Sequence, residues 1–392
     1  MDWPGDGTLI VTCGGGAEEA LEAELAELGI EILSRDNGTV RVRGAAREMA
    51  SVNTSARTAS RVLVPVAEGT VGSYDELYRL ARRVAWQRLI TPRQTLAVSA
   101  VTRDRALSDS RLAALTVKDA VVDAQRTGSG GTRSSIDRRR PDVPIALFIG
   151  NGSAVLSLDS SGAPLHERGY RREAGEAPLR ETVAATMLRY AGYDGTRTLV
   201  DPFCGSGTIV IEAAMIAAGL KPEALRNEFA FTRWGWLDRD GLPRPARRGP
   251  NAQPRAAGAE AKADPREAQR IVGRDTDERV LEIAARNAER AGVSDLVRFE
   301  RADALTAAPP SGAGLVVTNP PYGERMELGA AGSFYRRLGE NLKQNYPGCD
   351  VFLLSANRDA MKEIGLRVSS RRQLWNGGLD ARLYEIRIFA RE

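Results

Sequence analysis

The tetrapeptide Asn319-Pro320-Pro321-Tyr322 contains the residue types that point most directly to chemistry. It follows Gly314-Leu-Val-Val-Thr318, which has the apolar composition of a buried strand. Two prolines after a strand fix the backbone and remove its N–H donors, so that only acceptors remain. The side-chain oxygen of Asn319 and the carbonyl of Pro320 can each accept one N–H of a planar exocyclic amine, while Tyr322 stacks on the base. Two such acceptors favour the pyramidal amine, whose lone pair can attack an electrophile.

This arrangement does not require a strong base. Because a sulfonium is already electrophilic, the tetrapeptide fits methyl transfer from S-adenosylmethionine, in which the protein supplies alignment. A Pro-Pro turn after a buried strand is the alternative interpretation. His166 is the only histidine and nothing near it in the sequence orients it, so we assign it no chemistry. Cys13, Cys204 and Cys349 stand far apart, which disfavours zinc and Ser-His-Asp chemistry, and we predict no metal site.

Residues 198–214 read as a strand, a tight loop and a helix. The strand ends at Asp201-Pro202, Gly205 and Gly207 form the turn, and an apolar helix follows. Such a loop directs backbone N–H groups and the positive end of a helix dipole at a polar ligand. Because Val210 stands where a dinucleotide fingerprint has its third glycine, a nicotinamide-dependent oxidoreductase is disfavoured. An ordinary strand-to-helix turn remains the alternative.

Acidic residues end the next two predicted strands. Asp275 ends the strand 270–275, where a carboxylate can accept both hydrogens of a ribose diol, and Asp303 ends the strand 297–303. Residues 242–268 are rich in Pro, Gly, Ala and Arg, and we interpret them as a mobile insertion. The insertion moves Asp275 far beyond the roughly twenty residues at which a dinucleotide fold places its ribose-binding acid.

The remaining elements predict an α/β protein. Residues 9–43 read as strand, helix and strand, which indicates a small α+β unit at the N-terminus. At the other end, Asn376-Gly377-Gly378 is a hairpin turn signal between the predicted strands 367–375 and 379–390. An antiparallel hairpin ending a mostly parallel sheet resembles a class I (Rossmann-like) methyltransferase sheet.

Length and composition indicate a globular protein. The chain has 392 residues, 42% of them hydrophobic, which is enough for two or three domains with sizeable cores. No apolar run is long enough to span a membrane, and the first seven residues lack a secretory signal pattern, so we expect a cytoplasmic location and no membrane partner. The net charge of +4 favours a polyanionic partner, with a solvated basic surface as the alternative.

Two groups of basic residues suggest where such a partner binds. A predicted helix over 111–126 presents Arg111, Lys118 and Arg126, and a second group follows it in the sequence: Arg138, Arg139 and Arg140. Basic groups on a compact domain beside a catalytic one are typical of a surface that follows phosphates. The aromatic and basic stretch 229–236 could stack on bases or could equally pack as a lid.

Three segments resemble THUMP-containing RNA methyltransferases: Arg57-Thr-Ala-Ser-Arg, Val117-Lys-Asp-Ala-Val-Val-Asp and Leu165-His-Glu-Arg-Gly-Tyr-Arg. The whole chain is most similar to the enzymes that methylate guanine N2 in large-subunit ribosomal RNA, whose relatives modify transfer RNA. The resemblance implies an α/β fold with four parts: a ferredoxin-like unit at 1–55, an RNA-gripping THUMP domain at 56–160, a linker at 161–177 and a methyltransferase domain at 178–392.

The resemblance also implies roles for individual residues. Gly205 and Gly207 would approach the methionine portion of S-adenosylmethionine, Asp201 its amino group, Asp275 the ribose and Asp303 the adenine amine, while Asn319 to Tyr322 would hold the target base. The complete set of expected cofactor-binding residues is Pro178, Thr182, Asp201, Phe203, Cys204, Gly205, Ser206, Gly207, Thr208, Asp275, Thr276, Asp303, Ala304 and Asn319.

Four functions remain open at this point. The leading one is guanine-N2 methylation of 23S ribosomal RNA, and transfer RNA guanine-N2 methylation uses the same chemistry. Asn-Pro-Pro-Tyr would serve equally for adenine N6 in DNA, although the THUMP-like region counts against DNA. An RNA chaperone with a silent catalytic domain is disfavoured because the expected cofactor-binding residues are intact. The sequence does not indicate an oligomeric state.

Overall fold

The computed structural model describes residues 3–128, 131–171, 179–226, 228–243, 270–321 and 330–389. These residues fall into two compact units, and each is considered by itself. The first contains residues 1–13, 22–165 and 227–245, and the second contains 14–21, 166–226 and 246–392. Pro178, Tyr322 and all but the first two residues of the predicted insertion 242–268 lie outside the described residues. The domain boundaries predicted from the sequence stay predictions.

The first part of the chain is a mixture of strands and helices. In chain order, its elements are β1 (Thr8–Thr12), α1 (Glu18–Glu27), β2 (Ile32–Asp36), β3 (Thr39–Arg43), α2 (Ala46–Ser55), β4 (Arg61–Thr70), α3 (Tyr74–Arg82), α4 (Trp86–Leu89), β5 (Thr95–Thr102), α5 (Ser110–Gly128), β6 (Ser135–Ile136), β7 (Val143–Gly150) and β8 (Ser153–Asp159).

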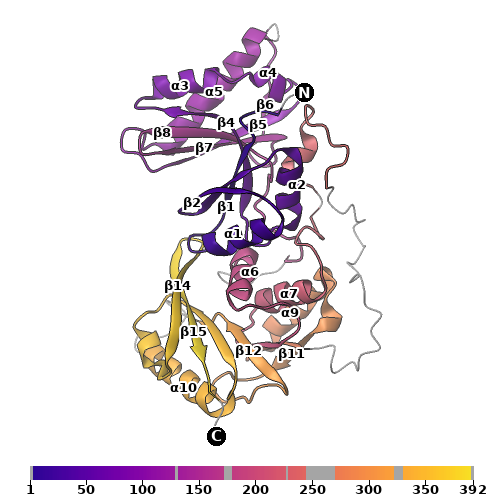
Figure 1. The fold of residues 1–392 in the computed structure, drawn as a ribbon, viewed down its shortest axis with the longest axis vertical. Coiled ribbons are helices and arrows are strands. Elements are labelled where there is room, and N and C mark those ends of the chain that lie inside the picture. Colours follow the sequence, from indigo (N-terminus) through magenta and orange to yellow (C-terminus); the bar gives the residue numbers. More distant parts are fainter. Residues whose placement is uncertain are drawn as a thin grey trace. The chain divides into compact units, whose positions relative to one another are not determined.

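These strands form one eight-stranded sheet in the order β2-β3-β1-β4-β8-β7-β5-β6. Most neighbours are antiparallel, and β5 runs parallel to β6 and β7. Helices α3 and α5 pack against each other and lie over one face of the strands β4 to β8 (Figure 1). On that face Ile145, Leu147 and Ile149 of β7 are almost fully buried, because alternate residues of a strand point to the same side.

The second part of the chain alternates helices and strands. Its elements are α6 (Glu181–Tyr190), β9 (Thr198–Asp201), α7 (Thr208–Ala217), η1 (Ala230–Arg233), β10 (Ile271–Asp275), α9 (Glu278–Ala291), η2 (Ser294–Leu296), β11 (Val297–Arg301), β12 (Ala313–Thr318), α10 (Ala330–Asn345), β13 (Asp350–Ser355), η4 (Ala360–Ile364), β14 (Val368–Asn376) and β15 (Leu379–Arg387).

The second unit contains a seven-stranded sheet in the order β11-β10-β9-β12-β13-β15-β14. The first five strands in that order are parallel, and β15 is antiparallel to both of its neighbours. Helix α10 packs through Tyr335, Leu338 and Leu342 against one core of this sheet, and α7 and α9 lie on the opposite side (Figure 1). The class I sheet with an antiparallel C-terminal hairpin is therefore confirmed.

One strand end differs from the prediction. β11 ends at Arg301, so Asp303 lies two residues beyond the strand rather than at its end. The chain turns at Asp303 because its Oδ1 accepts the backbone N–H of Leu305 at 2.9 Å and its carbonyl accepts that of Ala307 at 2.8 Å. Aspartate favours such local turns over a longer strand.

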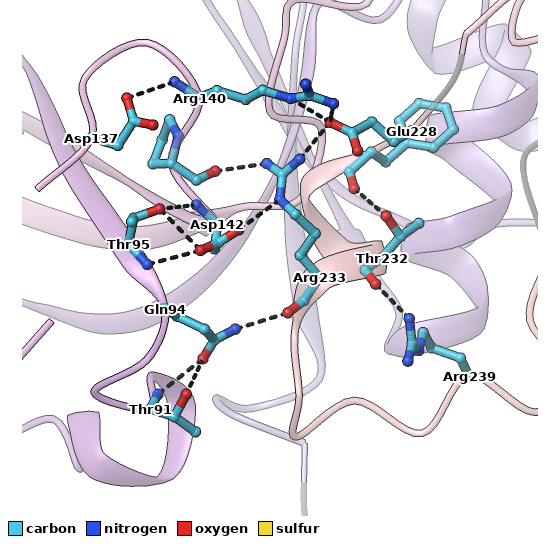
Figure 2. A network of polar contacts seen from close by, with 12 residues as sticks. Thr91, Gln94, Thr95, Asp137, Arg140, Asp142, Glu228, Thr232, Arg233 and Arg239 are labelled. Atoms are coloured by element: carbon cyan, nitrogen blue, oxygen red, sulfur yellow. Dashed lines mark hydrogen bonds and ion pairs between the residues drawn. The ribbon is translucent and has the colours of Figure 1, made fainter. Parts of the chain in front are cut away.

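Residues 228–243 follow α7 in the chain but belong to the first unit (Figure 2). Arg233 connects this segment to the start of β7. Its guanidinium donates to Glu228 Oε1 at 2.5 Å and to the carbonyl of Pro141 at 2.6 Å, and it lies 3.3 Å from Asp142 Oδ1. The side-chain amide of Gln94 adds a further contact, because its Nε2 donates to the carbonyl of Arg233 at 2.8 Å.

The aromatic residues of this segment are packed inward. Phe229, Phe231 and Trp234 are at most 2% exposed, and the ring of Trp236 lies between those of Trp234 and Trp3, with centroid distances of 5.3 and 5.9 Å. The rings of this segment therefore pack within the first unit. Burial of these rings leaves no accessible face on Phe229, Phe231 or Trp234 for a nucleobase.

We expect Arg233→Met to loosen residues 228–243, because Glu228 and Asp142 would lose a shared cation. Limited proteolysis should cut this segment faster in the variant, and hydrogen exchange of its amides should accelerate. Arg239→Ala is the matched control, since Arg239 lies in the same segment and is exposed, donating to the carbonyl of Thr232 (Figure 2). Equal protection in both variants would show that Arg233 does not hold the segment.

Candidate active site

The candidate site lies in the second unit, where the strand order reverses. From β9 the chain continues to β10 and β11 on one side, and to β12 and β13 on the other. Ligands of open parallel sheets bind beyond the carboxyl ends of the strands at such a reversal. The residues that end or directly follow β9, β10 and β12 are Asp201, Asp275 and Asn319. The fold thus brings three separately predicted residues to one sheet edge.

The loop after β9 is held by hydrogen bonds from its own backbone. Phe203 N donates to Asp201 Oδ1 at 3.1 Å, and Gly205 N donates to Asp275 Oδ2 at 3.1 Å. Cys204 N donates to the carbonyl of Arg274 at 2.8 Å. The loop is therefore attached to the end of the neighbouring strand β10.

The two glycines of this loop have different tasks. Both have left-handed backbones, with φ of 53° at Gly205 and 87° at Gly207. A Cβ at Gly205 would meet nothing within 4 Å, so its backbone faces open space. A Cβ at Gly207 would lie 3.1 Å from the Cβ of Ala284. Gly205 thus leaves room for a ligand to approach, whereas Gly207 lets α7 begin close against α9.

Asp201 connects the loop to the strand that carries Asn319. Its Oδ1 accepts the hydroxyl hydrogen of Thr318 at 2.7 Å, and both side chains are at most 1% exposed. Burial raises the pKa of Asp201 to about 7, the bonds from Thr318 and Phe203 oppose this rise, and the charge of Asp275 adds to it. The two motifs predicted separately from the sequence therefore share one buried hydrogen bond.

Asn319 comes directly after Thr318 in the chain and is half-buried. Its Oδ1 is shielded from solvent and accepts no hydrogen bond from any of the described residues. A shielded carbonyl oxygen without a donor is costly, so such an atom indicates a ligand donor. Pro320 is buried and Pro321 is half-buried, as expected for a rigid backbone after the strand.

The other predicted cofactor residues surround the same strand ends. Thr182 and Thr208 are buried in α6 and α7, and Phe203 and Ser206 are half-buried in the loop. Burial raises the pKa of the Cys204 thiol well above its usual value, which disfavours its thiolate form. Beyond β10 and β11, Thr276 and Asp303 are exposed and Ala304 is buried.

A buried network that sequence reasoning missed supports α7 from behind. Tyr170 donates its hydroxyl to Glu212 Oε1 at 3.2 Å, and the guanidinium of Arg168 lies 3.6 Å from the same oxygen. Arg171 pairs with Glu181 of α6 at 2.9 Å. Residues 165–171 lie within the predicted linker 161–177, yet Arg168 and Tyr170 are almost fully buried. The one signal for this stretch in the sequence is that residues 165–171 resemble a segment of THUMP-containing RNA methyltransferases.

The predicted RNA-binding residues lie in the first unit. Arg111 and Arg126 of α5 are exposed, and the half-buried Lys118 pairs with Asp119 at 2.6 Å. Arg138 and Arg139 are exposed as well. Arg140 is paired with Glu228 at 2.6 Å, so its charge is shared with residues 228–243 (Figure 2).

Among the described residues, none of the helices has the length and apolar content to cross a membrane. In the same part of the chain, no three His, Cys, Asp or Glu side chains are grouped so that they could hold a metal ion.

Three family models match the chain. Residues 168–385 match the RMKL-like methyltransferase domain, 72–159 match the THUMP domain, and 8–63 match the RlmL ferredoxin-like domain. The first match covers more than half of the chain and includes the whole candidate site.

Two relatives and one solved structure show how far this similarity extends. The ribosomal RNA large subunit methyltransferase K/L of Syntrophotalea carbinolica is 40% identical over 382 residues, which are 94% of this chain and 52% of that protein. The protein slr0064 of Synechocystis, whose name includes RNA methyltransferase, is 34% identical, and the match covers 95% of both chains. The crystal structure of SMU.472 complexed with SAH has a TM-score of 0.83, 26% identity and full coverage of both chains. The chain thus spans about half the length of the K/L relatives and nearly all of slr0064.

The buried Asp201 makes stability depend on pH. Its folded pKa of about 7 lies above the ordinary value of 3.8. Between these two pH values the carboxyl is ionised in the unfolded chain but protonated in the folded protein, so a rise in pH favours unfolding. We expect the melting temperature of the wild type to fall relative to that of Asp201→Asn as the pH rises from 4 to 7. Calorimetry of both proteins across this range measures the difference. A constant difference would mean that Asp201 is ionised in the folded protein.

Proposed function

Because this chain belongs to the RMKL-like methyltransferase family, we propose that it methylates the exocyclic N2 amine of a guanine in RNA, using S-adenosylmethionine. The observation that carries the proposal is the shielded, unbonded Oδ1 of Asn319 beside the glycine loop. Large-subunit ribosomal RNA is the proposed substrate, since the K/L relatives bear that RNA in their name. Transfer RNA is the second candidate within the same chemistry, because the residues of the site do not distinguish the two.

The residues at the sheet edge fit S-adenosylmethionine. Open space at Gly205 allows the methionine portion to approach the backbone, and Asp201 and Asp275 offer carboxylates for its amino group and its ribose. Asp303 and Ala304 lie beyond β11, where they would meet the adenine. The relative SMU.472 was solved with SAH, the demethylated form of this cofactor, which supports the same assignment.

The chain's own residues would prepare the target amine. Asn319 Oδ1 and the carbonyl of Pro320 would each accept one of its N–H groups, and Tyr322 would stack on the base. When bound by the residues at the sheet edge, S-adenosylmethionine would supply an electrophilic sulfonium methyl group, and the methylated amine would release one proton to solvent. Asp201 and Thr318 would position Asn319, because their hydrogen bond fixes the end of β12 beside the cofactor loop.

An amine of adenine would satisfy the same two acceptors. The THUMP match over residues 72–159 favours RNA over DNA, and the RNA methyltransferase names of the relatives point the same way. The predicted cytoplasmic location stays a prediction.

The open space at Gly205 predicts that a larger side chain there weakens cofactor binding. Gly205→Val would fill that space and strain a backbone with φ of 53°, so we expect S-adenosylmethionine to bind at least ten times more weakly. Isothermal calorimetry measures the affinity, and NAD should not bind to either protein. Gly378→Ala is the control, because Gly378 also has open space around it but lies in the β14–β15 turn. Unchanged binding by the Gly205 variant would remove the loop from the cofactor site.

The acceptor role of Asn319 predicts a loss of turnover when its side chain is removed. Asn319→Ala should lower the turnover number about a hundredfold, because a positioned transition-state contact is lost. Methyl transfer to unmodified large-subunit ribosomal RNA measures the rate. Asn37→Ala, at an exposed asparagine in the β2–β3 turn, is the control.

Mass spectrometry of the nucleosides identifies the product of the same assay. The proposal expects N2-methylguanosine in the wild-type reaction. Full turnover by Asn319→Ala would contradict the acceptor role, whereas N6-methyladenosine as the product would contradict the proposed base.

A further inference from the structure

One face of the sheet in the first unit is only partly covered. Its other face packs on α3 and α5 through the buried residues of β7 (Figure 1). On the partly covered face, Val101 of β5 and Phe148 of β7 are 57% and 43% exposed. They are direct neighbours, because Val101 pairs with Phe148 in the parallel ladder. On the other side Phe148 pairs with Val155 of β8, which is half-buried.

The ring of Phe148 lies along the sheet. A Cβ at Gly150 would come within 3.1 Å of two of its ring atoms, so the ring extends over the next residue of the same face. The guanidinium carbon of Arg103 lies 6.0 Å from the ring centroid. Arg103 continues β5, since its N–H donates to the carbonyl of Ile149 at 2.8 Å. An exposed aromatic ring and a planar cation therefore share one surface, which is called the Phe148 platform below.

The acidic residues Glu68 and Asp104 near the Phe148 platform already have an ion pair or hydrogen bonds within the protein. Glu68, which pairs with Val155 across the β4–β8 ladder, lies 3.0 Å from the guanidinium of Arg41. Asp104, next to Arg103, accepts the backbone N–H groups of Gly152 and Ala106, each at 2.8 Å, and these bonds lower its pKa. The Phe148 platform thus combines apolar area with a cation, and its carboxylates are already bonded.

We propose that the Phe148 platform stacks an unpaired base of the RNA substrate, while Arg103 contacts the adjacent phosphate or the base plane. This inference rests on the proposed RNA substrate and identifies where a single-stranded part of it would bind. Open sheet faces with exposed aromatic side chains bind single-stranded RNA in this way, because every base has a stacking face. Arginine beside such a ring adds both charge and a stacking plane.

The surface fits RNA better than a protein partner. A stable protein interface buries about 800 Å² on each side, with a well-packed apolar centre. The residues next to the Phe148 platform on β5 and β7 are instead Ser99 and Ala146, which are small and form no pocket wall for a side chain. A flat surface with one ring and one cation suits the planar shape and negative charge of a nucleotide.

Binding of the full-length protein to a 2-aminopurine-labelled single-stranded RNA tests this proposal. Phe148→Ala should weaken binding about 5- to 100-fold and abolish the quenching that stacking causes. Phe148→Trp should restore both. Leu33→Ala is the matched control, because Leu33 is 37% exposed on β2 of the same sheet, lies outside the predicted RNA-binding groups and should bind like the wild type. Unchanged affinity and quenching in Phe148→Ala would overturn the proposal and leave the surface to a protein partner.

Salt dependence separates the roles of Phe148 and Arg103. Arg103→Ala should reduce the slope of log affinity against log salt by about 0.7, because one phosphate contact is lost from a single strand. Phe148→Ala should lower the affinity without changing the slope, since stacking releases no counterions. A parallel calorimetric titration with S-adenosylmethionine distinguishes the two proposals, because these variants retain the cofactor site. Failure of the wild type to bind the cofactor would contradict the proposed function, whereas normal cofactor binding with unchanged RNA binding in Phe148→Ala contradicts only the Phe148 platform.

Discussion

The hydrogen bond between Asp201 and Thr318 is the interaction on which the candidate site depends. It joins the ends of β9 and β12, the two neighbouring strands at which the order of the sheet reverses. Because both side chains are buried, neither is free to exchange this contact for water, and the loop after β9 keeps a fixed distance from Asn319. A reaction that requires a donor and an acceptor in line needs such a fixed separation more than it needs a strong base.

The rest of the second unit stabilises this edge from several directions. Asp275 accepts the N–H of Gly205 and so fixes the loop to β10. Behind the loop, the buried Arg168 and Tyr170 hold Glu212 of α7. Removing one partner of such a buried pair typically costs about 3–5 kcal/mol, so these residues specify one arrangement of the helix. The site is thus built on strand ends and on a helix that buried polar contacts hold in place.

Sequence reasoning located most of the site because its residues follow regular elements. The glycine loop and the turn at Asn319 each come directly after an apolar strand, so chain order alone placed them at one edge of a parallel sheet. The predicted strand end at Asp303 was wrong by two residues, because the sequence pattern is the same whether an acid ends β11 or follows it two residues later. Pro178 and Tyr322 lie outside the described residues, and their roles stay predictions.

Contacts between distant parts of the chain could not be read from the sequence. The pairing of Arg140 with Glu228 joins residues 88 apart, and no periodicity reports such a contact. The burial of Phe229, Phe231 and Trp234 has the same origin, because an aromatic and basic stretch looks alike whether it faces solvent or the protein. The exposure of Phe148 was missed for the converse reason: its strand is apolar throughout, and only the position of α3 and α5 decides which alternate residues are covered.

The central claim is that Asn319 presents an unbonded acceptor to an exocyclic amine beside the cofactor. A crystal structure of the protein with S-adenosylhomocysteine and a guanine-containing RNA fragment tests it most directly. The account predicts Asn319 Oδ1 about 3 Å from the guanine N2, with the sulfur of the cofactor on the other side of that nitrogen. An Asn319 side chain that is turned away from the base, or that is hydrogen-bonded within the protein, would contradict the account.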